Sequence, residues 1–173
     1  MNLKDAFDTF KAVVFKIGSE EFAFHVEQVL SIEKTQRVTV VPAMPKHVLG
    51  VINLRGTITP VINLSTLLFS DLDLNPHDYQ LDKYIVVKYD KKPFALVVDE
   101  ATDVLDIPHD SIQTNTLTDK KVPSYLAGIS KLENRLITLI DANQLLLSMA
   151  SILEDESDNH YVGSEENEIQ HSR

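Results

Sequence analysis

The sequence predicts an all-β fold, in which two pseudo-symmetric five-stranded barrels pack together and a C-terminal helix follows. Three observations support this prediction. β-Branched residues crowd the first 140 of the 173 positions, which favours strands. One stretch of the chain recurs 78 residues further on without gaps. In both copies, turn-forming residues separate short apolar runs, as in β-hairpins.

The repeat aligns residues 50–68 with residues 128–146, and five of the 19 aligned positions are identical. Gly56 is aligned with Asn134, and both residue types tolerate the positive φ angles that tight hairpin turns require. Each of them lies between two apolar runs. Each copy therefore predicts a strand, a tight turn, a second strand and the start of a helix.

Two aligned residues, Asn63 and Asp141, are good helix N-caps. Gln144 follows Asp141 at the spacing of a capping box. We expect the last helix to run from about Ala142 to Asp155. Its apolar residues form one stripe that would pack on the barrels, namely Leu145, Leu146, Met149, Ile152 and Leu153.

A further hairpin precedes each copy of the repeat, and a single strand follows each of these hairpins. The expected strands are 12–17, 22–26 and 29–34 in the first half, and 85–89, 94–98 and 103–107 in the second. Each half thus offers about five strands, enough to close a small barrel. We expect interleaved barrels over roughly residues 10–83 and 84–150, with a connecting loop at 70–83 and one shared core.

The chain carries a net charge of −10, of which −6 falls in residues 154–173. We therefore expect one domain over residues 1–156 and a disordered acidic tail over residues 157–173. An acidic body without a basic cluster argues against nucleic-acid binding. The absence of cysteine excludes disulfides and thiolate sites and is compatible with a reducing cytoplasm. No apolar run is long enough to span a membrane, and the N-terminus lacks the apolar core of a signal peptide.

The sequence contains no motif that predicts catalysis, a cofactor or a metal site. The five glycines form no phosphate-binding loop, and the six histidines are scattered without metal-ligand spacing. The run His109-Asp110-Ser111 holds the residue types of a catalytic triad, but triads assemble from distant segments. The acidic residues between Asp99 and Asp106 leave a small acid-dependent hydrolase as an alternative.

The stretch from Val48 to Leu64 contains G-V-I-N-L-R-G-T-I-T-P-V-I-N-L and resembles the signature of the CheW family, with Asn63 replacing an acid. Residues 97–100, 125–129 and 136–141 resemble later landmarks of that family in the same order. The resemblance covers about residues 10–150. It implies two SH3-like barrels and a non-catalytic adaptor that couples chemoreceptors to the histidine kinase CheA.

The same resemblance implies two partners, which are the regulatory domain of CheA and the cytoplasmic hairpin tip of a methyl-accepting chemoreceptor. It places the chain in the cytoplasm, at membrane-bound receptor arrays, without inserting into the membrane itself. An adaptor of a non-flagellar chemosensory pathway, such as one for twitching, is the alternative within the family.

Arg55 is the foremost candidate for contact with a partner, because it stands beside Gly56 at a hairpin tip and Arg is enriched at interface hot spots. The full set of candidate partner-binding residues is Arg55, Asn53, Gly56, Val29, Ser31, Asp99 and Glu100. Ser31 stands where the family often has an acid. The second copy has Glu133 at the position of Arg55, so the two tips differ in charge and suit different partners.

Deletion of residues 157–173 is expected to change the free energy of unfolding by less than about 0.5 kcal/mol, because a polar, acidic tail buries little apolar surface. Urea denaturation of the full chain and of the truncated chain measures this. A large loss of stability on truncation would show instead that the tail packs against the body.

Overall fold

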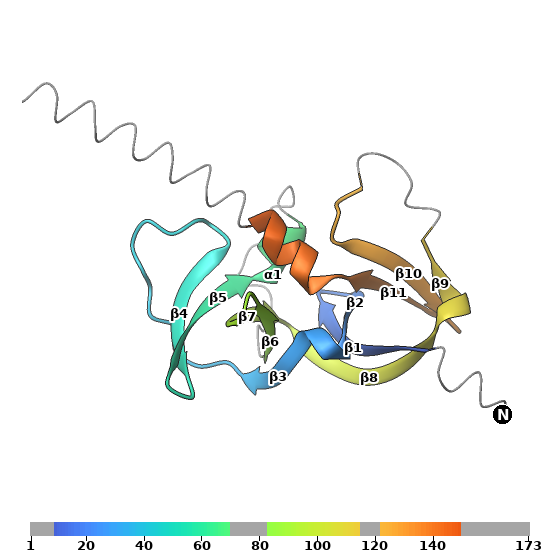
Figure 1. Cartoon of the computed structure of the whole chain (residues 1–173), viewed down its shortest axis with the longest axis horizontal. Helices are drawn as coiled ribbons and strands as arrows, with labels where there is room; N and C mark the ends of the chain where they lie inside the picture. Colours follow the sequence, from blue (N-terminus) through green and yellow to red (C-terminus); the bar gives the residue numbers. More distant parts are fainter. Residues whose placement is uncertain (1–8, 70–82, 115–121, 150–173) are drawn as a thin grey trace, which may run out of the picture.

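Strands make up most of the computed structural model, which describes residues 9–69, 83–114 and 122–149. They form two sheets that lie beside each other along the long axis of the molecule (Figure 1). The strands are β1 (Thr9–Ile17), β2 (Glu20–His25), β3 (Val29–Lys34), β4 (Val48–Leu54), β5 (Thr57–Asn63), β6 (Lys83–Tyr89), β7 (Lys92–Val98), β8 (Glu100–Pro108), β9 (Ile112–Gln113), β10 (Leu126–Leu132) and β11 (Arg135–Ile140). The short helices are η1 (Val26–Gln28), α1 (Leu64–Leu68) and η2 (His109–Ser111), and residues 142–149 are also helical.

Each sheet takes strands from both halves of the chain. One sheet has the order β8-β1-β2-β11-β10-β9, and the other has the order β3-β6-β7-β5-β4. In both, the first hairpin of one half joins the closing hairpin of the other half through a parallel pair, β2 with β11 and β7 with β5. Neither half of the chain therefore completes a sheet by itself.

The predicted all-β class with two packed barrels and a following helix is confirmed, and the predicted strand 29–34 coincides with β3. The turns of the first hairpin of each half are tighter than predicted, because Gly18-Ser19 and Asp90-Lys91 alone connect the strands. The predicted loop after residue 69, the helix beyond residue 149 and the tail at 157–173 lie outside the described residues.

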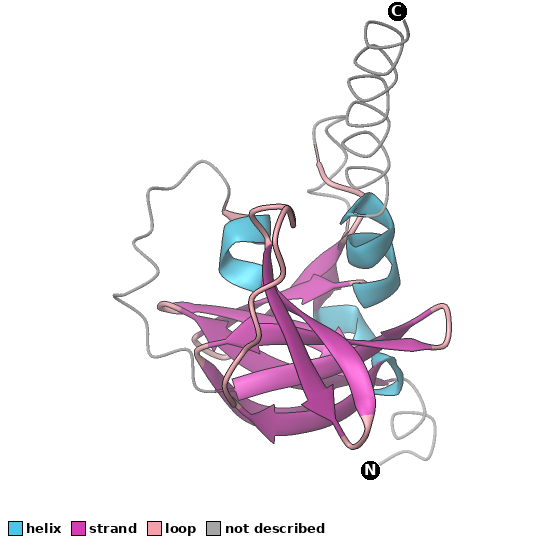
Figure 2. Cartoon of the chain, turned by 90° about the vertical axis from the view of Figure 1, so that its left-hand side faces the viewer, coloured by secondary structure: helices cyan, strands magenta, loops and turns pink. Residues whose placement is uncertain are grey.

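One apolar core is shared by the two sheets. It is built from alternate residues of β1, β2, β6 and β7, together with residues of β5 and β11. Phe15 is fully buried at its centre, with its ring stacked on Phe24 at a centroid distance of 4.8 Å. Leu64 of α1 and Leu145 of the helical residues 142–149 close the same core. Figure 2 shows both helices on the same side of the sheets.

The intervening residues of these strands fill a second and a third core, one in the interior of each barrel. Ala12, Val14 and Ala23 face the first of these, and Val86 and Val97 face the other. The central strands are therefore apolar on both faces. This explains why their sequences show only a partial alternation of apolar and polar residues.

The repeated glycines allow a neighbouring segment to pass close to the backbone. Gly50 has φ +148°, and a Cβ atom there would lie 2.2 Å from the carbonyl oxygen of Thr39, which pairs with Val51. At the matching position, a Cβ atom on Gly128 would lie 2.8 Å from Cγ2 of Ile112 on β9. Each glycine therefore admits one further extended segment at the edge of its sheet.

An ion-pair network ties three strands of the first sheet together. Arg135 of β11 donates two hydrogen bonds to Glu21 of β2, at 2.7 and 3.1 Å, and a third to Asp103 of β8 at 3.1 Å. The hydrogen bonds from Arg135 hold the pKa of Glu21 below its ordinary value of 4.5.

Replacement of Phe15 by Ala is expected to lower the free energy of unfolding by about 3–5 kcal/mol, because it opens a cavity in the core that both sheets share. Urea denaturation measures this. The control is Ile58→Ala, since Ile58 is 66% exposed and its truncation should cost far less. Similar losses in the two variants would contradict the shared core.

Replacement of Glu21 by Gln is expected to remove up to about 1 kcal/mol of stability at neutral pH, since Arg135 is partly exposed. Because folding lowers the pKa of Glu21, its contribution is complete above 4.5 and is lost as the pH falls through the folded-state pKa. The free energies of unfolding of wild type and variant, measured at several pH values between 7 and 3, should therefore become more similar as the pH falls. Glu20→Gln, at an exposed neighbouring carboxylate, serves as the control, and a constant gap down to pH 3 would rule out the role of Glu21.

Candidate partner-binding surface

Three of the candidate residues form the hairpin tip between β4 and β5. Leu54 pairs with Thr57, and the two residues between them, Arg55 and Gly56, have φ angles of 50° and 84°. Such paired positive φ angles belong to the tight turns that match the twist of a hairpin. The N–H group of Gly56 donates to Oδ1 of Asn53 at 2.8 Å. Asn53 and Gly56 therefore shape the turn that presents Arg55.

Arg55 is held at the end of β3 by an ion pair. Its Nη2 lies 2.6 Å from Oε1 of Glu33, while 73% of the Arg55 side chain stays exposed. A second bond runs from Nε2 of Gln36 to the backbone oxygen of Asn53 at 3.1 Å. The tip is thus fixed in position while most of the guanidinium remains available to a partner. We call Arg55 and Glu33, together with the exposed residues Leu30 and Ile32 of β3, the Arg55 surface.

β3 contributes two faces with different properties. Val29, Ser31 and Glu33 alternate on its half-buried face, and Val29 packs against the shared core. Leu30 and Ile32 point outward and are exposed. The structure therefore brings Val29 and Ser31 onto the strand that holds Arg55, through Glu33.

The set of candidates drawn from the sequence does not contain Glu33, Leu30 or Ile32. The period of two along a strand is the signal that identifies them, since it places Glu33 on the face of Ser31 and the two apolar residues on the opposite face.

Asp99 and Glu100 are positioned differently. Asp99 accepts a hydrogen bond from the N–H group of Gly18 through Oδ2, and its own N–H group donates to the backbone oxygen of Lys16 at 3.1 Å. Its Oδ1 is buried and has no hydrogen-bond partner within the described part of the chain. Asp99 therefore fastens the turn between β1 and β2 to the start of β8. Glu100 is exposed at that same point, and a role in partner binding stays a proposal for both residues.

The second copy presents a tip of opposite charge. Glu133 occupies the turn between β10 and β11 with φ 50°, one residue before Asn134. The nearby Arg135 is engaged by Glu21 and Asp103. The two barrels therefore expose an arginine in one case and a glutamate in the other at matching positions.

No group of three or more His, Asp or Glu side chains converges as a metal site within residues 9–69, 83–114 and 122–149. Two of the carboxylates that suggested a hydrolase have structural partners, because Asp99 holds a turn and Asp103 pairs with Arg135. In the same ranges, no helix is long and apolar enough to cross a bilayer.

A family model described as the CheW-like domain matches residues 11–149, which contain the Arg55 surface and both sheets except the first two residues of β1. The chain belongs to the CheW family. Its curated relatives include the chemotaxis protein CheW of Bacillus subtilis (strain 168), which is 37% identical over 140 residues, covering 79% of this chain and 86% of that protein. The chemotaxis protein CheW of Thermotoga maritima is 29% identical, covering 83% of this chain and 92% of that protein.

Among solved structures, the crystal structure of the scaffolding protein TtCheW from Thermoanaerobacter tengcongensis superposes with a TM-score of 0.69. That chain is 27% identical, and the match covers 79% of this chain and 92% of that one. Membership of the CheW family confirms the prediction of a scaffold protein that is not an enzyme, so the acid-dependent hydrolase is excluded.

Proposed function

We propose that this protein is a cytoplasmic adaptor that couples membrane-bound chemoreceptors to the regulatory domain of the histidine kinase CheA. Its membership of the CheW family and the naming of its relatives as chemotaxis proteins support this proposal. The observation that carries it is the Arg55 surface, where a largely exposed arginine is held by Glu33 of β3 and the other face of that strand exposes Leu30 and Ile32.

The composition of this surface suits a protein interface. Arg offers a planar fork of donors, and an arginine beside apolar groups is a common hot spot. Leu30 and Ile32 on β3 supply the exposed apolar area of the surface, and Ile58, three residues after Arg55 in the sequence, is exposed as well. Because Glu33 already fixes Arg55 in place, binding costs less side-chain entropy than it would for a free arginine.

The two barrels present similar apolar positions with different charges, which suits an adaptor with two partners. Ile58 is 66% exposed and stands near Arg55. Leu136, its counterpart 78 residues later, is 64% exposed and stands near Glu133. Like charges in an interface repel, so a partner suited to one tip is disfavoured at the other. The two tips therefore discriminate between partner surfaces of different charge.

The two proposed partners require different kinds of contact. A barrel of the kinase regulatory domain fits end to end against a barrel of this chain, in an interface of modest area. The hairpin tip of a receptor is helical and fits along the junction between the two barrels. One rigid body that holds both contacts relays a change in the receptor to the kinase.

Replacement of Arg55 by Ala is expected to weaken binding of the kinase regulatory domain or of the receptor tip by about 1 kcal/mol or more, which is about fivefold in Kd. The melting temperature should change little, because the Arg55 side chain is 73% exposed and an ion pair with so exposed a partner contributes little. Isothermal titration calorimetry against each partner measures the affinities.

Lys88→Ala, at an exposed cation on β6, is the matched control and should leave both affinities unchanged. The result that counts against the proposal is Arg55→Ala binding both partners as tightly as wild type.

A further inference from the structure

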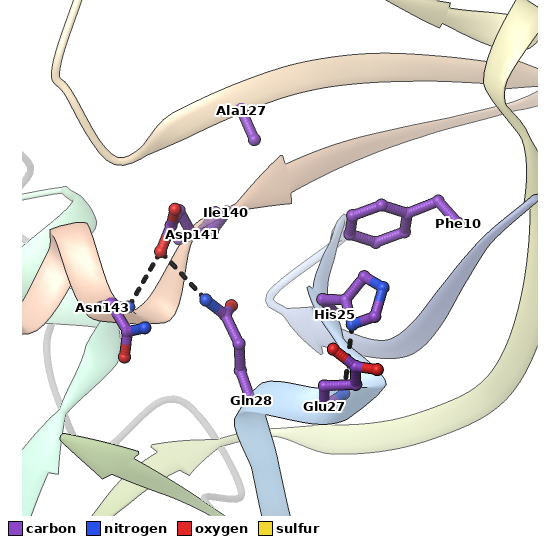
Figure 3. A pocket seen from close by; sticks show the side chains of 8 residues that line it. All are labelled: Phe10, His25, Glu27, Gln28, Ala127, Ile140, Asp141 and Asn143. Atoms are coloured by element: carbon purple, nitrogen blue, oxygen red, sulfur yellow. Dashed lines mark hydrogen bonds between the residues drawn. The ribbon is translucent and has the colours of Figure 1, made fainter.

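A cavity of about 450 Å³ opens where η1, the N-terminus of the helical residues 142–149 and the beginnings of β1 and β10 meet (Figure 3). It is lined by Phe10, His25, Glu27, Gln28, Ala127, Ile140, Asp141 and Asn143. Its volume lies in the range of sites that bind small ligands or long side chains. None of the seven candidate residues proposed from the sequence lines it.

The walls of this cavity are held in place by contacts within the chain. Gln28 links two of them, since its Nε2 donates to Oδ1 of Asp141 at 3.0 Å and its Oε1 accepts from the N–H group of Ala142 at 2.9 Å. Nδ1 of His25 accepts from the N–H group of Glu27 at 3.1 Å, which caps η1. The Phe10 ring packs edge-on against His25. The cavity is therefore preformed, which lowers the entropic cost of filling it.

Its lining combines negative charge with an apolar wall. Glu27 and Asp141 contribute carboxylates, and the lining contains no Lys or Arg. The bonds that Asp141 accepts from Gln28, Asn143 and Gln144 all end on Oδ1, so Oδ2 takes part in none of them. Phe10, Ala127 and Ile140 form the apolar part.

The first copy of the repeat shows that the charge of Asp141 is not needed for capping. Asn63, its counterpart, caps α1 with a neutral side chain whose Oδ1 accepts from the N–H group of Ser65 at 3.1 Å. Asn63 is only 4% exposed. Since Asn and Asp cap helices about equally well, the capping role accounts for the side-chain oxygen of Asp141 but not for its charge beside a cavity.

We infer that this cavity receives an arginine side chain of a partner protein. Its guanidinium binds Asp141 and Glu27, and its methylene stem lies along Ile140 and Ala127. A planar guanidinium forks onto carboxylates and packs on an aromatic ring such as that of Phe10, which a lysine ammonium does less well. We take the occupant to be a protein residue because the solved relative TtCheW is a scaffolding protein. The inference does not depend on what the Arg55 surface binds.

The test uses the isolated full chain, so its outcome is independent of the proposed function. Amide spectra of the ¹⁵N-labelled protein are recorded during titration with N-acetyl-arginine amide. The comparison ligands are the neutral isostere N-acetyl-citrulline amide, N-acetyl-lysine amide and the small cation agmatine. The variants are Asp141→Asn, which keeps an N-cap residue, and Glu27→Gln, with Asp106→Asn as the control at an exposed carboxylate outside the cavity.

Saturable shifts are expected at residues 25–28, 127 and 141–143 with capped arginine, at millimolar Kd. Citrulline should bind about tenfold more weakly. Asp141→Asn and Glu27→Gln should each weaken arginine binding about fivefold or more, while Asp106→Asn binds as wild type.

Equal binding of citrulline and arginine, or undiminished binding by both cavity variants, would overturn the inference. Equal binding of lysine would overturn the assignment of arginine. Tighter binding of agmatine than of capped arginine would show that the cavity takes a small cation rather than a residue of a partner protein.

Discussion

The fold depends on one constraint, which is that the central strands bury both of their faces. In β1, Phe15 packs in the core shared by the two sheets, while its neighbour Val14 packs in the interior of the barrel that the first sheet forms. In β7, Leu96 and Val97 divide in the same way. Neither sheet can separate from the other without exposing apolar surface on strands that have no polar face. The two sheets therefore act as one rigid unit, and within the described residues the hairpin tips, edge strands and helix ends are the parts left free to meet partners.

Local features of the fold could be predicted from the sequence because they repeat. The alignment of Gly56 with Asn134 located the hairpin turns, and the alignment of Asn63 with Asp141 located the helix starts. The alignment could not show that the hairpin β1–β2 joins β11 and that β6–β7 joins β5. Strand partners are chosen by packing between distant segments, on which a repeat carries no information. The close approach of Thr39 to Gly50 likewise became visible only in three dimensions.

The candidate site divides along the same line. Arg55, Asn53 and Gly56 could be proposed from the sequence because they belong to one motif and one turn. The contact that positions Arg55 comes from Glu33, which is distant in sequence. The contacts of Gln28 with Asp141 and of Asp99 with Gly18 likewise join residues far apart in the chain. The predicted capping box at Gln144 is only half formed, because the N–H group of Gln144 donates to Oδ1 of Asp141 but the N–H group of Asp141 donates to the backbone oxygen of Tyr125. The side chain of Gln28 instead accepts from the N–H group of Ala142. No local spacing identifies such long-range pairs.

The unlike tips, with Arg55 on one barrel and Glu133 on the other, belong to one body whose rigidity rests on the shared core. Native-state hydrogen exchange tests that core most directly, by measuring the opening free energy of amides in β1 and β2 beside those in β6 and β7. If the two sheets form one cooperative unit, the slowest amides of both, such as those of Phe15 and Leu96, exchange with the same free energy, equal to that of global unfolding. Two separate values, one for each sheet, would show that the barrels open independently and would contradict the shared core.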